Sequence, residues 1–187
     1  LSPVNNGASG RQTLNKAIQK IVNPVDGPSD IVFGGKSRDK TKIKYFKKGD
    51  YITVKKNEYD FLSDQNEVTQ LINGDLGYVE KTTKTTLTFS IGKSRYTIDK
   101  SEINELLDHA WAITIHKSQG GQANVVIIVL PYNSYFMLSA NMLYTAITRT
   151  RSKCYVIGDF SGINKASKIQ ANFTRKTMIQ FQSEARN

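Results

Sequence analysis

The chain has 187 residues, of which 39% are hydrophobic, so it suffices for one domain or two small ones and is too apolar for a disordered chain. Its net charge of +10 favours a polyanionic partner, nucleic acid before membrane. No apolar run approaches the roughly 20 residues that span a bilayer, and one cysteine with two histidines excludes a structural zinc site.

The single cysteine, Cys154, also excludes an intrachain disulfide and suits a reducing, cytoplasmic location. The chain opens as Leu1-Ser-Pro-Val without a starting methionine, and we expect a piece of a longer protein. Residues 1–23 then predict a strand end, a loop and a helix. The helix is indicated by apolar residues at helical spacing, from Leu14 to Val22, and Asn23-Pro24 ends it.

Residues 33–106 predict a small antiparallel barrel. Short alternating runs separated by turn residues are typical of such a fold. The expected strands are Tyr51–Val54, Gly77–Val79, Thr86–Ile91 and Arg95–Ile98. A short helix with Ser101 as its cap is expected next, and Lys36 to Lys48 holds seven basic residues against one Asp.

Residues 107–187 predict an α/β arrangement. Trp111–Ile115 and Asn124–Leu130 are apolar runs typical of parallel strands that are buried on both faces. A helix over 138–147, with Ser139 as its N-cap, separates them from a third run, Cys154–Ile157. Because the first helix is expected to pack on the same sheet, the barrel is predicted to be an insertion in this α/β domain.

Two tripeptides, Gly35-Lys36-Ser37 and Gly92-Lys93-Ser94, look like the end of a phosphate-binding P-loop. That motif needs a glycine five residues before the second one, and those positions hold Asp30 and Leu87. We interpret both tripeptides as ordinary turns.

Two other segments are better candidates. Thr114 to Gly121 is a polar loop with two glycines after a buried strand, which suits phosphate oxygens. The segment Tyr144 to Arg151 is a helix that ends in two arginines. Those arginines either compensate the helix dipole or present a guanidinium to a transferring phosphate.

Together these segments resemble motifs five and six of superfamily 1 helicases. The residues concerned are Ala112-Ile-Thr-Ile-His-Lys-Ser-Gln-Gly120, Val125 to Pro131, and Met142-Leu-Tyr-Thr-Ala-Ile-Thr-Arg149. The opening from Leu1 to Pro24, with Gly49-Asp50, Asn73 to Gly77 and Arg175 to Thr177, is similar to RecD-like helicases, the exodeoxyribonuclease V alpha-subunit family.

The resemblance implies a RecA-like second motor domain at 1–32 and 107–187, a parallel sheet with helices, with an SH3-like barrel inserted at 33–106. In such helicases ATP and Mg²⁺ lie between this domain and a first RecA-like domain, and single-stranded DNA crosses both. Arg149 matches the arginine finger and is expected to be catalytic. The resemblance assigns nucleotide binding to Gln119, Gly120, Gln122 and Arg149, and DNA binding to Thr114, His116, Lys117 and Ser118.

The sequence departs from this pattern at Gln122, where the family usually has Glu. It also contains no full P-loop and no Asp-Glu dipeptide, so we expect this fragment to bind no cofactor and hydrolyse no ATP by itself. The expected parent is an ATP-dependent 5′→3′ DNA helicase with a role in DNA repair, acting alone or with subunits of an exonuclease complex. A non-catalytic nucleic-acid or protein binding module and an RNA helicase fragment remain as alternatives.

Overall fold

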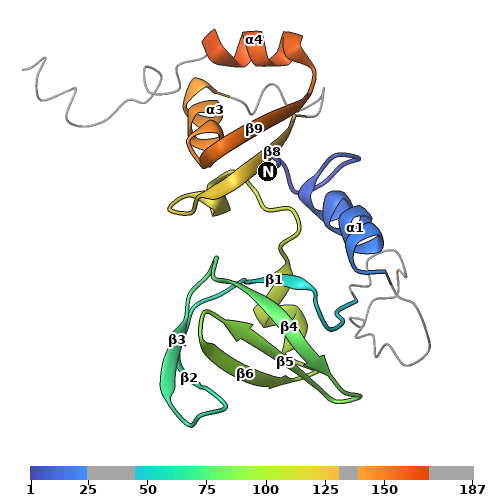
Figure 1. Ribbon diagram of the computed structural model, residues 1–187, viewed down its shortest axis with the longest axis vertical. Coiled ribbons are helices and arrows are strands. Elements are labelled where there is room, and N and C mark those ends of the chain that lie inside the picture. Colours follow the sequence, from blue (N-terminus) through green and yellow to red (C-terminus); the bar gives the residue numbers. More distant parts are fainter. Residues whose placement is uncertain (25–44, 131–138, 169–187) are drawn as a thin grey trace, which may run out of the picture. The chain divides into compact units, whose positions relative to one another are not determined.

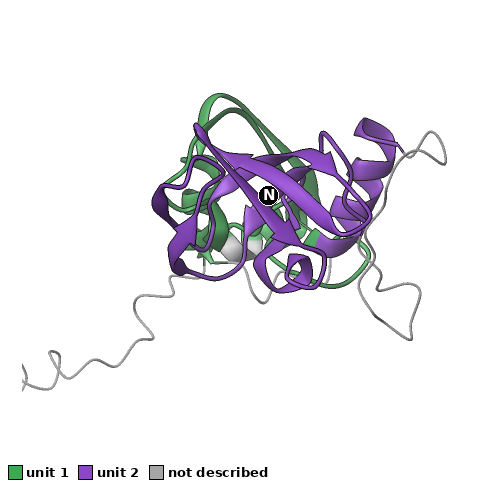
Figure 2. Cartoon of the chain, turned by 90° about the horizontal axis from the view of Figure 1, so that it is seen from below, with its two compact units in different colours: residues 1–11, 113–187 green, residues 12–112 purple. Residues whose placement is uncertain are grey.

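The computed structural model describes residues 1–24, 45–130 and 139–168 (Figure 1). The chain divides into two compact units, each considered by itself: unit 1 comprises residues 1–11 and 113–187, and unit 2 comprises residues 12–112 (Figure 2). The predictions for Gly35-Lys36-Ser37, for most of the Lys36–Lys48 stretch and for Arg175 to Thr177 lie outside the described residues.

Unit 2 is built on antiparallel strands. Its main sheet has the order β6-β5-β4-β1-β7, and β2 and β3 pair with each other as a separate ribbon. The elements are α1 (Arg11–Val22), β1 (Tyr51–Val54), β2 (Glu58–Leu62), β3 (Val68–Leu71), β4 (Leu76–Thr82), β5 (Thr86–Ile91), β6 (Ser94–Asp99), α2 (Ile103–Leu106) and β7 (Leu107–His109). The predicted strands are therefore confirmed.

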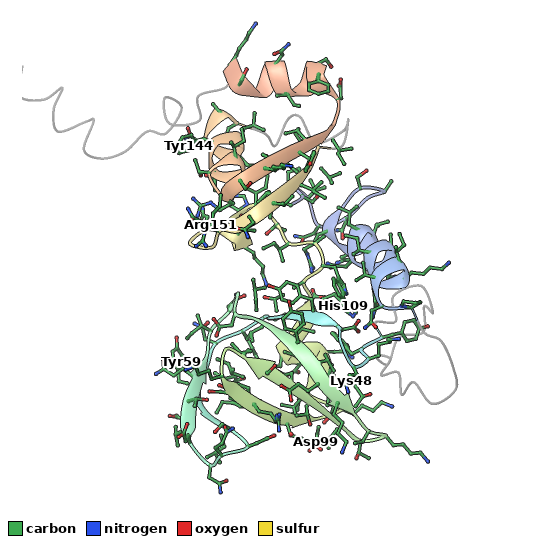
Figure 3. All side chains as sticks on the ribbon, in the orientation of Figure 1. Lys48, Tyr59, Asp99, His109, Tyr144 and Arg151 are labelled. Carbon is green, nitrogen blue, oxygen red and sulfur yellow. The ribbon has the colours of Figure 1, made fainter. Side chains whose placement is uncertain are left out.

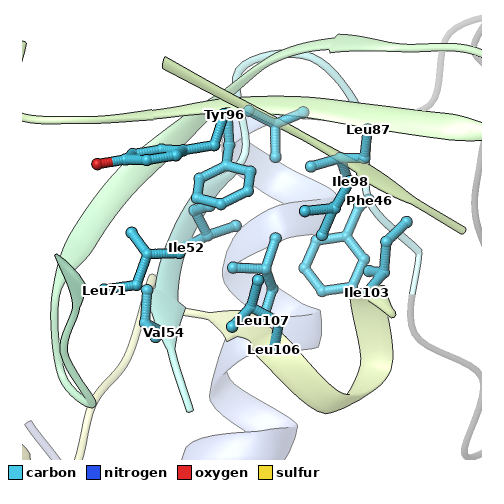
Figure 4. Packing of buried hydrophobic residues seen from close by; sticks show 12 residues of the cluster. Phe46, Ile52, Val54, Leu71, Leu87, Tyr96, Ile98, Ile103, Leu106 and Leu107 are labelled. Atoms are coloured by element: carbon cyan, nitrogen blue, oxygen red, sulfur yellow. The ribbon is translucent and has the colours of Figure 1, made fainter. Parts of the chain in front are cut away.

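One face of this sheet forms the core of unit 2. In β5, Leu87 and Phe89 are fully buried and alternate with partly exposed residues, as the period of a strand requires. Ile103 and Leu106 of α2 pack against the same core (Figure 4). The predicted cap at Ser101 is wrong, because the residue before α2 is Glu102 and no side chain caps the helix.

The expected closed barrel is not seen in the described residues. The main sheet ends at β6 and β7, and the β2–β3 pair shares no ladder with it. A bulge between Glu58 and Phe61 shifts the register of that pair. The sheets are therefore open, and alternation within each strand did not indicate which strands would pair.

Helix α1 is held within unit 2 by buried polar contacts. The Asn15 amide donates to the carbonyl of Ala112 and accepts from the Ala112 N–H, both at 2.8 Å. The Gln19 and Asn23 amides each donate to the Asp50 carboxylate at 2.7 Å. The helix predicted from apolar spacing is confirmed. The contacts that hold it in unit 2, however, are made by the polar side chains Asn15 and Gln19, which are not part of the apolar pattern.

Unit 1 contains a parallel pair of strands, β8 (Ala123–Leu130) and β9 (Thr150–Gly158). The chain start lies beside β8, since the Val129 N–H donates to the Leu1 carbonyl at 2.8 Å. Ser2 bridges in turn to Thr114 in parallel. The remaining elements are η2 (His116–Ser118), α3 (Ala140–Ile147) and α4 (Phe160–Lys168).

Helix α3 covers one face of the β8–β9 pair. Leu143 and Ala146 pack with Val126, Ile128 and Leu130 of β8. The Ser139 side chain accepts a hydrogen bond from the Met142 N–H, which confirms the predicted N-cap. Strand, helix and parallel strand give the predicted α/β arrangement in unit 1.

The other face of the β8–β9 pair departs from the prediction of strands buried on both sides. Val125 and Ile127 of β8 and Tyr155 and Ile157 of β9 are each about half exposed, between 49% and 57%. The predicted strand at Trp111–Ile115 is reduced to the single bridge at Thr114. An apolar run indicates a strand, but it does not show which faces the rest of the chain will cover.

Candidate functional site

The loop that leads into β8 is organised by its own hydroxyl groups. The Thr114 hydroxyl accepts from the Lys117 N–H at 3.2 Å, and the Ser118 hydroxyl donates to the Ile115 carbonyl at 2.7 Å. These contacts hold the single turn of η2. Thr114 and Ser118, both expected near DNA, thus have hydroxyls engaged within the loop, and Ser118 is buried.

The other residues expected near DNA lie on the same turn. His116 is exposed and Lys117 is partly buried. Both are in η2, between the hydroxyls that hold it. A short turn with a fixed backbone can present such side chains to a phosphate without ordering a flexible loop first.

Gln119, Gly120 and Gly121 complete the loop and are exposed. Gly120 has a φ of +85°, a left-handed conformation that side-chain-bearing residues rarely adopt. The Gly121 N–H donates back to the Ser118 carbonyl at 3.1 Å. This reversal directs the chain into β8 and leaves the Gly121 carbonyl accessible to a second segment.

That second segment is the end of α3. The Arg149 guanidinium donates from Nη1 to the Gly121 carbonyl at 3.2 Å and from Nε to the Thr145 carbonyl at 3.0 Å. Its Nη2 donates to the Thr148 hydroxyl at 3.1 Å. The two segments that the sequence singled out therefore meet at Arg149, and part of this arginine's role is to cap the end of α3.

Arg151 and Gln122 form a second contact between the same segments. The Arg151 Nε donates to the Gln122 Oε1 at 3.2 Å. Both residues are exposed, and Figure 3 shows Arg151 at the end of the β8–β9 pair where the loop lies. The sequence indicated Arg151 only as one of two arginines at the end of a helix. The signal that could have identified it is its position two residues after Arg149, with Thr150 between them.

The described part of unit 1 as a whole is strongly basic. Within the described residues of unit 1 there are seven Lys or Arg side chains and one carboxylate side chain, Asp159. That carboxylate accepts from Ser161 at the start of α4. The described part of the chain contains no group of three or more His, Cys, Asp or Glu residues that could hold a metal ion, and no helix in it is long and apolar enough to cross a membrane.

Residues 109–157, which contain the loop, β8, α3 and Arg149, match the UvrD-like helicase C-terminal domain. This segment is therefore similar to the C-terminal domain of UvrD-like helicases. The chain is more particularly similar to RecD helicases.

The ATP-dependent RecD2 DNA helicase of Deinococcus radiodurans is 28% identical over 96% of this chain and 22% of its own length. The RecBCD enzyme subunit RecD of Buchnera aphidicola is 33% identical over 49% of this chain and 16% of its own length. A structure of Bacteroides Pif1 bound to single-stranded DNA aligns with a TM-score of 0.48 and 19% identity, over 92% of this chain and 44% of that one. The chain thus spans about a fifth or less of the length of these curated relatives.

Proposed function

We propose that this chain is part of an ATP-dependent 5′→3′ DNA helicase, to which it contributes an arginine finger and part of the single-stranded DNA track. The observation that carries the proposal is the contact between Arg149 and the Gly121 carbonyl at 3.2 Å. It brings the arginine at the end of α3 to the glycine turn, where a phosphate group would meet both. The names of the relatives, which are DNA helicases, support the substrate class.

The proposed domain arrangement is the one that the resemblance to RecD-like helicases implies. Residues 1–32 and 107–187 would form the second RecA-like domain, and 33–106 an inserted module of the SH3-like type, whose described sheets are open. ATP and Mg²⁺ would bind between this domain and a first RecA-like domain of the same parent chain, with Gln119, Gly120 and Gln122 facing the nucleotide. The exposed loop and its basic surroundings fit a phosphate chain, and Mg²⁺ is assigned to the first domain.

Arg149 would stabilise the charge that develops on the transferring phosphate. Its guanidinium is held by carbonyl and hydroxyl groups with no net charge, so its positive charge is not cancelled. Thr114, His116, Lys117 and Ser118 would position the DNA backbone. Since the P-loop would lie in the first domain, the chain alone is expected to show no ATP turnover.

Arg149→Ala in the parent helicase is expected to lower DNA-stimulated ATP turnover on the order of 10³-fold, with a modest loss of nucleotide binding. Steady-state turnover and nucleotide affinity, measured together, separate these effects. Arg149→Lys is the matched control, because it keeps the charge and loses the planar fork; it should recover only part of the rate. Near-normal turnover of Arg149→Ala would refute the finger.

A second candidate is a non-catalytic nucleic-acid binding module, favoured by aromatic rings in unit 2. The rings of Tyr51 and Tyr78 lie 4.8 Å apart, and Trp111 lies 6.2 Å from Tyr51. Burial, and then the neighbouring Tyr78, raises the pKa of Tyr51 above its ordinary value. Rings of this kind offer stacking surfaces to unpaired bases.

A parent chain without ATPase activity would favour this module, and stimulation by RNA in place of DNA would favour an RNA helicase.

A further inference from the structure

Arg151 differs from Arg149 in how much of its guanidinium is engaged. Arg149 donates through all three of its nitrogens. Arg151 donates through Nε to Gln122, and among the described residues its two terminal nitrogens have no hydrogen bond or ion pair. An arginine that is oriented through Nε and open at its terminal nitrogens can offer both to a single anion.

The partner of Arg151 is neutral. The Gln122 Oε1 accepts one hydrogen bond at 3.2 Å and brings no negative charge. A carboxylate at this position would pair with the guanidinium and cancel its charge. Because the one carboxylate side chain in the described part of unit 1, Asp159, binds Ser161, the charge of Arg151 remains available to a ligand.

Arg149 and Arg151 contact adjacent residues of one loop. Arg149 donates to the Gly121 carbonyl, and Arg151 to the side chain of Gln122. The ladder between β8 and β9 fixes this arrangement, since Ala123 pairs with Thr150, the residue between the two arginines. Two guanidinium groups are therefore attached to the same loop at one end of a rigid strand pair.

We propose that Arg151, oriented by Gln122, is a second phosphate-binding arginine beside Arg149, and that its ligand is the phosphate chain of a nucleoside triphosphate. This rests on the proposed function, since it adds a group to the same nucleotide site. Adjacent phosphates of one triphosphate carry several charges close together, which matches two arginines fixed to neighbouring loop residues. A DNA backbone phosphate is the other source of the same chemistry, and the experiment separates the two.

The experiment measures binding of inorganic tripolyphosphate and of a short thymidine oligonucleotide to the parent helicase, in which the proposed nucleotide site is complete, by calorimetry. Gln122→Glu is expected to weaken tripolyphosphate binding about tenfold, the effect of losing one charge-assisted contact, and to change oligonucleotide binding less. Arg151→Ala should weaken tripolyphosphate binding by a similar factor. Lys153→Ala is the matched control, since it removes a positive charge from the same strand, beside Val125 and away from the loop.

A nuclear magnetic resonance signal of the Arg151 Nε–H provides a readout that a merely structural role would not move. Tripolyphosphate should shift this signal in the unaltered helicase. In Gln122→Glu the signal should stay well resolved, because the side chain is still held, while its response to tripolyphosphate is reduced.

The inference is overturned if the unaltered helicase fails to bind tripolyphosphate, or if Gln122→Glu binds it as tightly as the unaltered helicase does. It is also overturned if the substitution weakens the oligonucleotide alone, because the ligand would then be the DNA backbone. None of these results alters the test of Arg149 in the parent helicase, so the proposed function and this inference can fail independently.

Discussion

At the scale of single residues, Asp50 of unit 2 is a fully buried carboxylate. Besides the amides of Gln19 and Asn23, it accepts from the Lys47 N–H at 2.9 Å, and the His109 Nε2 lies 3.4 Å from its Oδ2. Every one of these partners presents a hydrogen to the carboxylate or could do so. Asp50 therefore joins α1, the turn before β1, and β7.

Asp50→Asn is expected to lower the free energy of unfolding by roughly 2–3 kcal/mol, because one oxygen becomes an NH₂ group that faces other donors. Urea unfolding followed by circular dichroism measures the change. Asp60→Asn is the matched control: this carboxylate is exposed, and its substitution should alter stability by less than about 0.5 kcal/mol. Equal effects of the two substitutions would contradict the role given to Asp50.

Gly77 shows how a single position governs an element. It lies in β4 between two strands, paired with Ile52 of β1 and Ile91 of β5. A Cβ atom at this position would lie 2.0 Å from the Ser90 carbonyl oxygen. Since that oxygen belongs to the backbone of β5, the clash cannot be relieved by moving a side chain.

Gly77→Ala is therefore expected to separate β4 from β5 locally and to cost roughly 1–3 kcal/mol of stability. The melting temperature and amide hydrogen exchange of β5 would report this. Gly121→Ala serves as the comparison, because the nearest atom to its Cβ would be the Ser118 carbonyl oxygen at 3.6 Å. A Gly77→Ala chain with unchanged exchange in β5 would show that the strands can adjust.

At the scale of the whole molecule, charge is unevenly distributed. The described residues of unit 1 hold most of the basic excess, whereas those of unit 2 carry eleven basic and eleven acidic side chains. Unit 1 also carries residues 113–157 of the segment that matches the UvrD-like helicase C-terminal domain. We therefore expect the electrostatic part of DNA binding to arise mainly from unit 1.

The isolated chain is expected to bind an oligonucleotide weakly and in a salt-sensitive manner. About three phosphate contacts would lower the affinity roughly 15-fold between about 50 and 200 mM salt. Fluorescence anisotropy at several salt concentrations gives this slope. Lys117→Ala should reduce the slope by the amount that corresponds to roughly one phosphate contact, and Lys93→Ala in unit 2 should leave the slope unchanged. A salt-independent affinity would contradict an electrostatic DNA contact.

The sequence by itself determined most helices and strands, and it identified the two segments of the candidate functional site, Thr114 to Gly121 and Tyr144 to Arg151. Periodicity predicted α1 and the strands β1, β4, β5 and β6, an apolar run predicted β8, and the residue type at Ser139 predicted the N-cap of α3. These features depend on residues a few positions apart, so local pattern suffices. The resemblance at Thr114–Gly121 and Tyr144–Arg151 likewise needed only adjacent residues.

Only the tertiary structure decided how those elements and segments come together. Leu1 lies beside β8, and Asp50 lies between residues of α1 and β7. Arg149 donates a hydrogen bond to Gly121, and Arg151 donates one to Gln122. In the described residues the sheets remain open, and one face of the β8–β9 pair is about half exposed. Each of these outcomes depends on contacts between residues distant in the chain, whose geometry is set by strand pairing and packing and leaves no periodic signal in the sequence.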